Sequence, residues 1–276
     1  MEATAFDPHV ALAWIERVEG SARERERDEV AVEEPLEIRV DGAALAVTMR
    51  TPGEDEELAV GFLAGEGMIR ERSEVVYAGL TEDFANNTIE VRTRSGVRRT
   101  PGDERRFYLT SSCGVCGKGA LEFVRQEAPP SATGARLAPA VVLRLPDIAR
   151  DRQWAFERTG GLHATALFEA DGTLRVLRED VGRHNAMDKA LGHMLLGGRY
   201  PLPGVFACLS GRASFELVQK ASLAGMAGIV AVGAPSSLAI DLSRERGMLL
   251  CGFVRGGGFN VYAGADRLAW EDGFEK

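Results

Sequence analysis

The first part of the chain shows the hydrophobic and polar pattern of a small α+β unit. Residues 36–40 and 45–47 alternate apolar and polar side chains around Asp41-Gly42, which predicts a β-hairpin. Thr51-Pro52-Gly53-Glu54 is typical of a capping box with proline at the first helical position. We therefore expect a helix that begins there and runs to about Ala64.

Two more alternating runs, residues 88–94 and 105–110, predict further strands, and the second leads directly into Ser111-Ser112-Cys113. Residues 128–139 are rich in proline and alanine and carry no periodic pattern. We place a lobe boundary in this stretch. The expected organisation is an N-terminal α+β lobe, residues 1–135, and a second lobe, residues 136–276.

The second lobe alternates strand patterns with helix patterns and predicts a three-layer α/β sandwich with a mixed sheet. Its first strands, residues 161–168 and 174–177, form a pair around Asp171-Gly172, and an amphipathic helix is expected at residues 185–196. Apolar strands then alternate with helices. The expected strands are residues 205–210, 228–232 and 248–254, and the expected helices are residues 214–224 and 237–246.

Composition limits the classes of function. The 276 residues are 45% hydrophobic, enough for an ordinary globular core, and the net charge of −8 disfavours a general nucleic-acid binder. The first 19 residues lack the blocks of a secretory signal, and no apolar run approaches the roughly 18 residues of a membrane span. We expect a cytoplasmic protein that does not bind membranes. Residues 21–29 alternate arginine with acidic residues and predict a solvated turn or helix.

The cysteines point to thiol chemistry. There are four, and only Cys113 and Cys116 lie close together, so a disulfide framework of the secreted kind is excluded. Glycines flank this CxxC pair and leave the backbone mobile. A helix starting near Lys118 would favour the reactive thiolate, which can accept sulfur from another protein's persulfide. Cys208 and Cys251 lie in apolar strand patterns and are expected to be buried.

Two other interpretations of the CxxC pair are weaker. A structural zinc site needs four ligands at closed spacing, and neither a second CxxC nor an HxxxH is present, so we expect no zinc. A thioredoxin-like disulfide catalyst should carry its CxxC at the start of the long helix of a βαβ unit. Here glycines follow the pair, and only a short helix is expected after them.

Three turns of the second lobe have the composition of phosphate-binding turns. Ser210-Gly211-Arg212 and Gly233-Ala234-Pro235-Ser236 each lie between an apolar strand and a helix, where free N–H groups attract anions. In the third, residues 252–260, Arg255 can pair with phosphate and Phe259 can stack on a base. Helix capping explains the first two turns equally well, and a β-bulge or bend explains the third.

A polar stretch, residues 179–185, precedes the helix expected at residues 185–196. Asp180 is expected to cap that helix, and Arg183 and His184 at its start would face the same cleft as the three turns. His163 alternates with apolar residues on a strand. A histidine in such a place is either a hydrogen-bonded core residue or part of a site, and both remain open.

Taken together, these stretches resemble the FdhD family of sulfurtransferase accessory proteins. The resemblance covers nearly the whole chain, and its motifs occur in order. They are Thr51-Pro52-Gly53 with residues 57–63, the stretch from Ser111 to Gly117, Thr159-Gly160-Gly161-Leu162-His163, residues 179–186, Ser210-Gly211-Arg212, and Gly252-Phe253-Val254-Arg255.

The resemblance implies a specific activity. A cysteine desulfurase would load the CxxC pair with persulfide sulfur, which then passes to the molybdenum of a bis-molybdopterin guanine dinucleotide cofactor for formate dehydrogenase. The resemblance also implies a cytidine-deaminase-like second lobe and a homodimer. The persulfide cysteine maps onto Cys113, and the cofactor-binding stretch maps onto residues 253–258.

Two hypotheses of function follow. In the first, the protein is a sulfurtransferase in which Cys113 carries the sulfur and Cys116 relays or resolves it. In the second, it is a non-catalytic chaperone that binds the cofactor and delivers it to formate dehydrogenase. Both need the same predicted cofactor-binding residues, namely His163, Arg183, His184, Ser210, Gly211, Arg212, Phe253, Val254, Arg255, Gly256, Gly257 and Gly258.

Overall fold

The structure is a computed structural model that describes residues 7–80, 87–98 and 134–270. Both cysteines of the predicted sulfur-carrying pair, Cys113 and Cys116, lie outside these residues, as does the strand expected at residues 105–110. None of the helices in the described ranges combines the length and the apolar composition that a membrane crossing requires.

A six-stranded sheet forms the centre of the second half of the chain. Its order is β12-β11-β10-β9-β7-β8; β9, β10 and β11 run parallel, while β12, β7 and β8 are each antiparallel to their neighbours. The predicted mixed sheet is therefore confirmed. The strands are β7 (His163–Phe168), β8 (Leu174–Asp180), β9 (Phe206–Leu209), β10 (Gly228–Ala231), β11 (Leu249–Arg255) and β12 (Gly258–Ala263).

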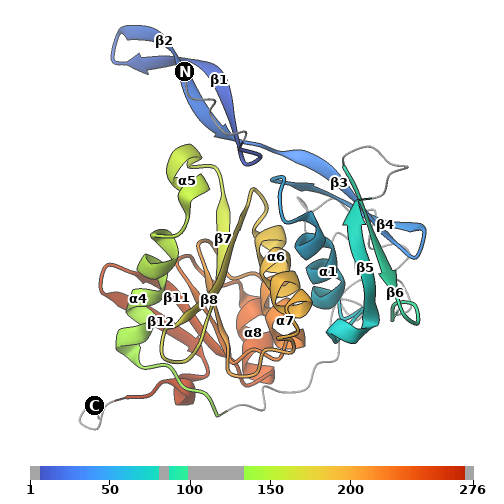
Figure 1. The fold of residues 1–276 in the computed structure, drawn as a ribbon. Helices are drawn as coiled ribbons and strands as arrows, with labels where there is room; N and C mark the ends of the chain where they lie inside the picture. The colour runs from blue at the N-terminus through green and yellow to red at the C-terminus, as the bar shows by residue number, and fades with distance from the viewer. Residues whose placement is uncertain (1–6, 81–86, 99–133, 271–276) are drawn as a thin grey trace.

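Helices cover both faces of this sheet (Figure 1). On one side lies α4 (Pro139–Arg150); on the other lie α6 (Arg183–Leu196), α7 (Phe215–Leu223) and α8 (Ser237–Glu245). The alternation of side chains along β9 matches this layering. Phe206 and Cys208 pack against the side of the sheet that α4 covers. Ala207 and Leu209 pack against the side that α6, α7 and α8 cover. Neither α4 nor the short α5 (Trp154–Thr159) was predicted from the sequence.

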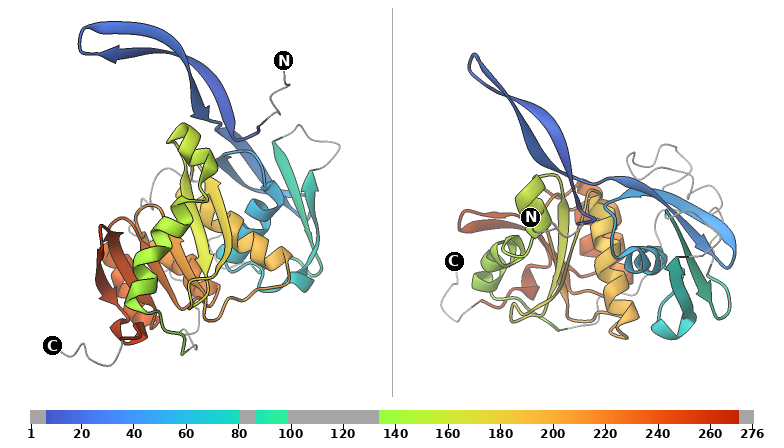
Figure 2. Two further views of the ribbon diagram at one scale, coloured as in Figure 1. Left: turned by 60° about the vertical axis from the view of Figure 1, so that its left-hand side comes forward. Right: turned by 45° about the horizontal axis from the view of Figure 1, so that its top comes forward.

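A second, four-stranded sheet has the order β4-β3-β6-β5 and packs on α1. Figure 2 shows α1 lying between this sheet and α6. The predicted hairpin is confirmed as β3 and β4. The elements are β3 (Glu34–Val40), β4 (Ala43–Arg50), α1 (Asp55–Gly65), β5 (Val75–Leu80) and β6 (Thr88–Thr93), with short 3-10 turns at Arg72–Glu74 and Ala265–Arg267.

The predicted capping box at the start of α1 is wrong. The helix begins at Asp55 after Glu54, which has φ 50° and makes no side-chain cap hydrogen bond. The hydroxyl of Thr51 instead accepts a hydrogen bond from the backbone N–H of Val181, 3.1 Å away. Thr51 therefore links the start of α1 to β8, a contact that local sequence spacing does not reveal.

Residues 21–29 are largely solvated as predicted, but the prediction of a turn or helix there is wrong, because residues 22–29 belong to β2 (Ala22–Ala31), which pairs antiparallel with β1 (Val10–Glu19). Alternation of arginine with acidic residues has a period of two, which suits a strand with two solvated faces as well as it suits a polar helix. The resulting hairpin projects from the body of the molecule (Figures 1 and 2).

Two glycines allow α1 and α6 to pack in backbone contact. A Cβ atom at Gly61 would collide with the carbonyl oxygen of Asp188, and one at Gly192 would collide with the carbonyl oxygen of Glu57. The obstructing atoms are backbone on the facing helix, so neither collision can be relieved by a side-chain rotation.

We predict that Gly61→Ala destabilises the protein by about 3 kcal/mol or more, the upper end of overpacking effects, although alanine favours a helix over glycine by about 1 kcal/mol. Urea unfolding of the variant and the wild type measures the difference. Gly134→Ala is the matched control, because a Cβ atom at Gly134 meets no atom within 4 Å. Equal unfolding midpoints for Gly61→Ala and the wild type would contradict the packing described here.

Candidate functional site

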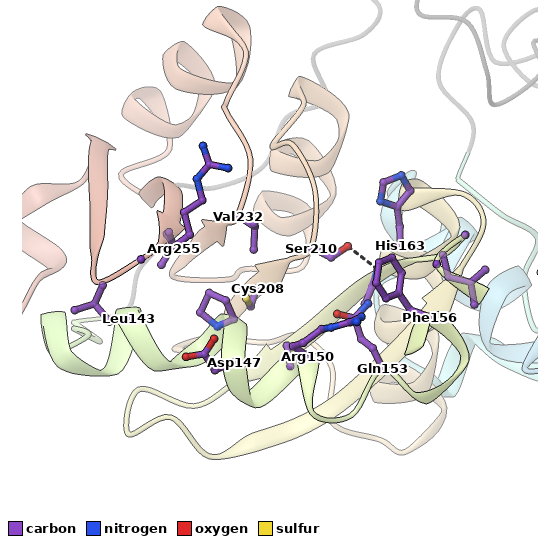
Figure 3. Close-up of a pocket in the computed structure, with 18 of the residues that line it drawn as sticks. Leu143, Asp147, Arg150, Gln153, Phe156, His163, Cys208, Ser210, Val232 and Arg255 are labelled. Atoms are coloured by element: carbon purple, nitrogen blue, oxygen red, sulfur yellow. Dashed lines mark hydrogen bonds between the residues drawn. The ribbon is translucent and has the colours of Figure 1, made fainter. Parts of the chain in front are cut away.

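A cavity of about 640 Å³ opens at one edge of the large sheet (Figure 3). Ser210 follows β9, Val232 follows β10 and Arg255 ends β11, so the carboxyl ends of three parallel strands meet there. His163 begins β7, which runs antiparallel to β9 and therefore starts at the same edge. This is the place at which open α/β sheets bind their ligands.

Three turns stack at the edge of the sheet around this cavity. The backbone N–H of Gly233 donates to the carbonyl of Gly211 at 3.0 Å, and the N–H of Phe253 donates to the carbonyl of Gly233 at 3.1 Å. A Cβ atom at Gly233 would lie 3.0 Å from the carbonyl carbon of Gly211, tighter than ordinary contacts allow. The strand β11 has positive φ, 55°, at Phe253, an uncommon conformation for a side chain with a Cβ atom. The predicted phosphate-type turns thus form one connected unit.

His163 is held against the first of these turns. A Cβ atom at Gly211 would lie 3.3 Å from Nδ1 of His163, and the hydroxyl of Ser210 accepts a hydrogen bond from the N–H of Ala164 at 2.8 Å. Burial lowers the pKa of His163 below 6.5, and three positive neighbours, Arg183, Arg212 and His184, lower it further. At neutral pH the imidazole is therefore an uncharged hydrogen-bonding group that lines the cavity.

The opposite wall of the cavity comes from α4, α5 and the turn between them. The guanidinium of Arg150 lies 4.2 Å from the ring centroid of Phe156. Gln153 is 5% exposed and lines the cavity. The carboxylate of Glu179, whose pKa burial raises, accepts hydrogen bonds from the N–H groups of Ala155 and Phe156 and so holds α5 in place.

This wall was missed by the sequence prediction. The missed residues are Leu143, Pro146, Asp147, Arg150, Gln153 and Phe156. The signal was present, because Val141, Val142, Leu145 and Ala149 repeat at helical spacing after Pro139 at the first turn. The internal Pro146 and the neighbouring proline-rich stretch obscured it.

Asp180 does not cap α6 as predicted. The N-cap is Gly182, which makes no side-chain cap, and Asp180 accepts hydrogen bonds from the Gly182 N–H at 2.8 Å and the Asn185 side-chain amide at 3.0 Å. Its other oxygen lies 3.0 Å from Nζ of Lys189 and 3.1 Å from the N–H of Thr51. This part of the polar stretch therefore joins the two sheets.

Arg183 and His184, in the same stretch, lie close enough to His163 to act on it electrostatically. His184 Nε2 is 3.4 Å from the hydroxyl of Ser214 and 3.9 Å from the carboxylate of Glu216. The neighbouring His184 side chain is the main reason that the pKa of Glu216 falls to about 2. The buried Nε of Arg183 has no hydrogen-bond partner among the described residues.

The cavity brings together six of the predicted cofactor-binding residues and leaves out six. Those that line it are His163, Ser210, Val254, Arg255, Gly256 and Gly257. Those that do not line it are Arg183, His184, Gly211, Arg212, Phe253 and Gly258. Gly211 and Phe253 belong to the stacked turns, and Arg183, His184 and Arg212 act on His163 through their charge.

The two described cysteines are buried, as predicted. Cys208 lines the cavity and Cys251 lies two strands away, and burial raises the pKa of each thiol to about 12. Both thiols therefore stay protonated near neutral pH, whereas sulfur transfer needs a thiolate. Among the described residues, no group of three or more histidine, cysteine or acidic side chains is placed to hold a metal.

Comparisons with known proteins agree with this picture. The FdhD/NarQ family model matches residues 31–269. The Sulfur carrier protein FdhD of Streptomyces coelicolor is 50% identical over 267 residues, covering 92% of this chain and 93% of the relative. The Sulfur carrier protein FdhD of Mycolicibacterium paratuberculosis is 52% identical over 248 residues, covering 87% of this chain and 91% of the relative.

A solved structure shows the same fold. The crystal structure described as a formate dehydrogenase accessory protein from Desulfotalea psychrophila aligns with a TM-score of 0.78 and 25% identity, covering 95% of this chain and all of that chain. The family model extends over both the four-stranded and the six-stranded sheet. The chain therefore belongs to the FdhD/NarQ family.

Proposed function

We propose that this protein carries sulfur for the maturation of formate dehydrogenase. The thiolate of Cys113 attacks the outer sulfur of a cysteine desulfurase persulfide; the new S–S bond forms on Cys113 and the desulfurase leaves as its thiolate. Cys116 relays or resolves the sulfur: when its thiolate attacks the Cys113 sulfur, a Cys113–Cys116 disulfide forms and the outer sulfur leaves as hydrosulfide for the acceptor. The acceptor is the molybdenum of a bis-molybdopterin guanine dinucleotide, which the protein binds as cargo. The names of the relatives, sulfur carrier proteins, support the first half of this proposal.

The observation that carries the second half is the cavity. His163, Ser210 and Arg255 come from three distant parts of the sequence, and the fold places all three on one cavity of about 640 Å³, a volume within the usual range for small-molecule sites. Folding alone does not require polar groups to converge on an open cavity. Their convergence supports a bound ligand with matching polar groups.

The chemistry of the lining fits a guanine nucleotide portion of the cofactor. Arg255 and the glycine-rich turn Gly256-Gly257 offer charge and close backbone approach to phosphate. On the opposite wall, Phe156 offers an aromatic face and Gln153 offers a buried amide that can both donate and accept. Such an amide is complementary to the mixed donor and acceptor edge of a guanine base.

We expect Cys113→Ala to abolish sulfur loading, because Cys208 and Cys251 are buried and protonated and cannot replace it. The wild type and the variant are incubated with a cysteine desulfurase and free cysteine, and intact mass spectrometry measures the added sulfur. Cys208→Ala is the control and should load like the wild type. Full loading of Cys113→Ala would exclude Cys113 as the carrier.

A second experiment replaces both CxxC cysteines in cells. Formate dehydrogenase activity that persists in these cells would favour the chaperone hypothesis.

Arg255→Ala should weaken binding of guanosine diphosphate by about ten- to a hundredfold, because a charge-assisted hydrogen bond to phosphate contributes about 1.5–3 kcal/mol. Isothermal titration calorimetry of the full chain measures the dissociation constant. Arg244→Ala removes an exposed arginine from α8, on the other face of the sheet, and should not change it. Equal affinities for all three proteins would place the nucleotide elsewhere.

Nucleotide binding should take up a proton at His163. In the free protein burial lowers its pKa below the usual value, and a phosphate bound nearby would raise the pKa, so affinity should increase as the pH falls from neutral. Calorimetry at pH 6.5 in two buffers of different ionisation enthalpy measures the uptake. The variant His163→Gln should lose it. Identical proton uptake in the variant would show that another group, such as the phosphate itself, is responsible.

A further inference from the structure

The hairpin of β1 and β2 forms an arm, the β1–β2 arm, whose base lies against the short helix α5 (Figures 1 and 2). Of the described helices and strands, β2 and β1 are the ones that α5 packs against most closely. Among the six residues of α5, Ala155 is the buried one. A helix this short is not stable by itself, so the position of α5 depends on contacts with its surroundings.

Arg158 joins α5 to the arm through two carboxylates. Its Nε donates to Glu29 at 2.8 Å, and its Nη2 donates to the other oxygen of the same carboxylate, which makes the pair bidentate. Its Nη1 donates to Asp7 at 2.6 Å. The hydrogen bonds from Arg158 hold the pKa of Glu29 below the ordinary value of a glutamate. A bidentate pair extended by a second carboxylate is the kind of surface ion pair that fixes geometry.

Two packing contacts lie beside this ion-pair network. The rings of His9, which precedes β1, and Trp154, which begins α5, meet edge to face with their centroids 5.5 Å apart. Ala31, at the end of β2, lies close to Gly161, because a Cβ atom added at Gly161 would be 3.3 Å from the Cβ atom of Ala31. The base of the arm therefore touches the first residue of α5 and the turn that follows its last.

The same short segment lines the cavity. Phe156 lies on the cavity wall, and Gly160 and Gly161 of the following turn line it as well (Figure 3). On the side of the sheet, Glu179 accepts hydrogen bonds from the N–H groups of Ala155 and Phe156. The helix is thus held by Glu179 from the sheet and by the arm from outside, and losing the outer contact would leave the wall less firmly placed.

We propose that Arg158 is a positioning residue for the cavity: it anchors α5 to the β1–β2 arm and so holds Phe156 in place, and a change at the arm therefore alters the affinity of the cavity for its ligand. That ligand is the guanine nucleotide of the proposed function, on which this inference rests. Coupling between two sites is reciprocal, so an occupied cavity also steadies the base of the arm.

Amide hydrogen exchange of the full chain tests the anchor without any ligand. In Arg158→Ala, the N–H groups of Ala155 and Phe156 should exchange at least about fivefold faster than in the wild type, because α5 opens more often. Arg23→Ala is the matched control, since it removes an arginine that pairs with Glu16 near the tip of the arm and should leave the exchange of α5 unchanged. Unchanged exchange in Arg158→Ala would overturn the proposal.

Calorimetric titration with guanosine diphosphate tests the effect on the cavity. Arg158→Ala should bind about fivefold more weakly than the wild type, at the lower end of coupling between sites. Glu29→Ala separates positioning from electrostatics, because losing a negative charge would by itself strengthen the binding of an anion, whereas losing the anchor weakens it. The double variant should bind no more weakly than Arg158→Ala, because both changes remove the same contact. Tighter binding by Glu29→Ala, or additive losses in the double variant, would overturn the proposal.

The reciprocal effect is measured at the base of the arm, where the N–H of Val32 donates to the carbonyl of His9 at 2.9 Å. Saturating guanosine diphosphate should slow the exchange of this N–H in the wild type but not in Arg158→Ala. A wild type that binds the nucleotide without this slowing would overturn the coupling. A wild type that binds no guanosine diphosphate would refute the guanine site of the proposed function, and the exchange of α5 in the ligand-free proteins would still decide whether Arg158 holds the wall.

Discussion

The buried ion pair between Asp180 and Lys189 is the contact on which the arrangement of the two sheets depends. Both side chains are 0% exposed, and both also bind the backbone of Thr51, at the entry to α1. Removing a charge from water costs several kcal/mol unless its partner is in place. Because β8, α6 and the loop before α1 each supply one member of this cluster, none of the three can be buried correctly without the other two.

The same elements build the cavity. Glu179, next to Asp180, holds the first turn of α5 and so positions Phe156, while Arg183 and His184 begin α6 and act on His163 by their charge. Neighbouring side chains in residues 179–184 therefore have different roles. The alternation follows from the extended strand that ends there and the helix that follows it. Residues of one family motif therefore contribute both to the contact between the two sheets and to the cavity.

Binding and thiol chemistry are separate in the described residues. Cys208 lies on the cavity itself, yet the burial that makes the cavity walls also keeps its thiol protonated. Under the proposed function, the cavity supplies recognition, and a reactive thiol has to come from Cys113 or Cys116. The β1–β2 arm is separate again in space, since it contacts α5 at its base and projects away from the body of the molecule.

The sequence alone determined the features that depend on local periodicity. Alternation and helical spacing identified β3, β4 and the strands and helices from β7 to β11, and strand ends identified the turns at Ser210 and Arg255. Tertiary structure decided the rest. Thr51 contacts Asp180, Val181 and Lys189, each more than a hundred residues away, whereas local spacing suggested helix caps at Thr51 and Asp180. The cavity wall formed by α4 and α5 was likewise missed, because a helix that contains proline resembles a linker. The β1–β2 arm was missed because alternating charges suit a strand as well as a helix, and only pairing with a second strand decides between them.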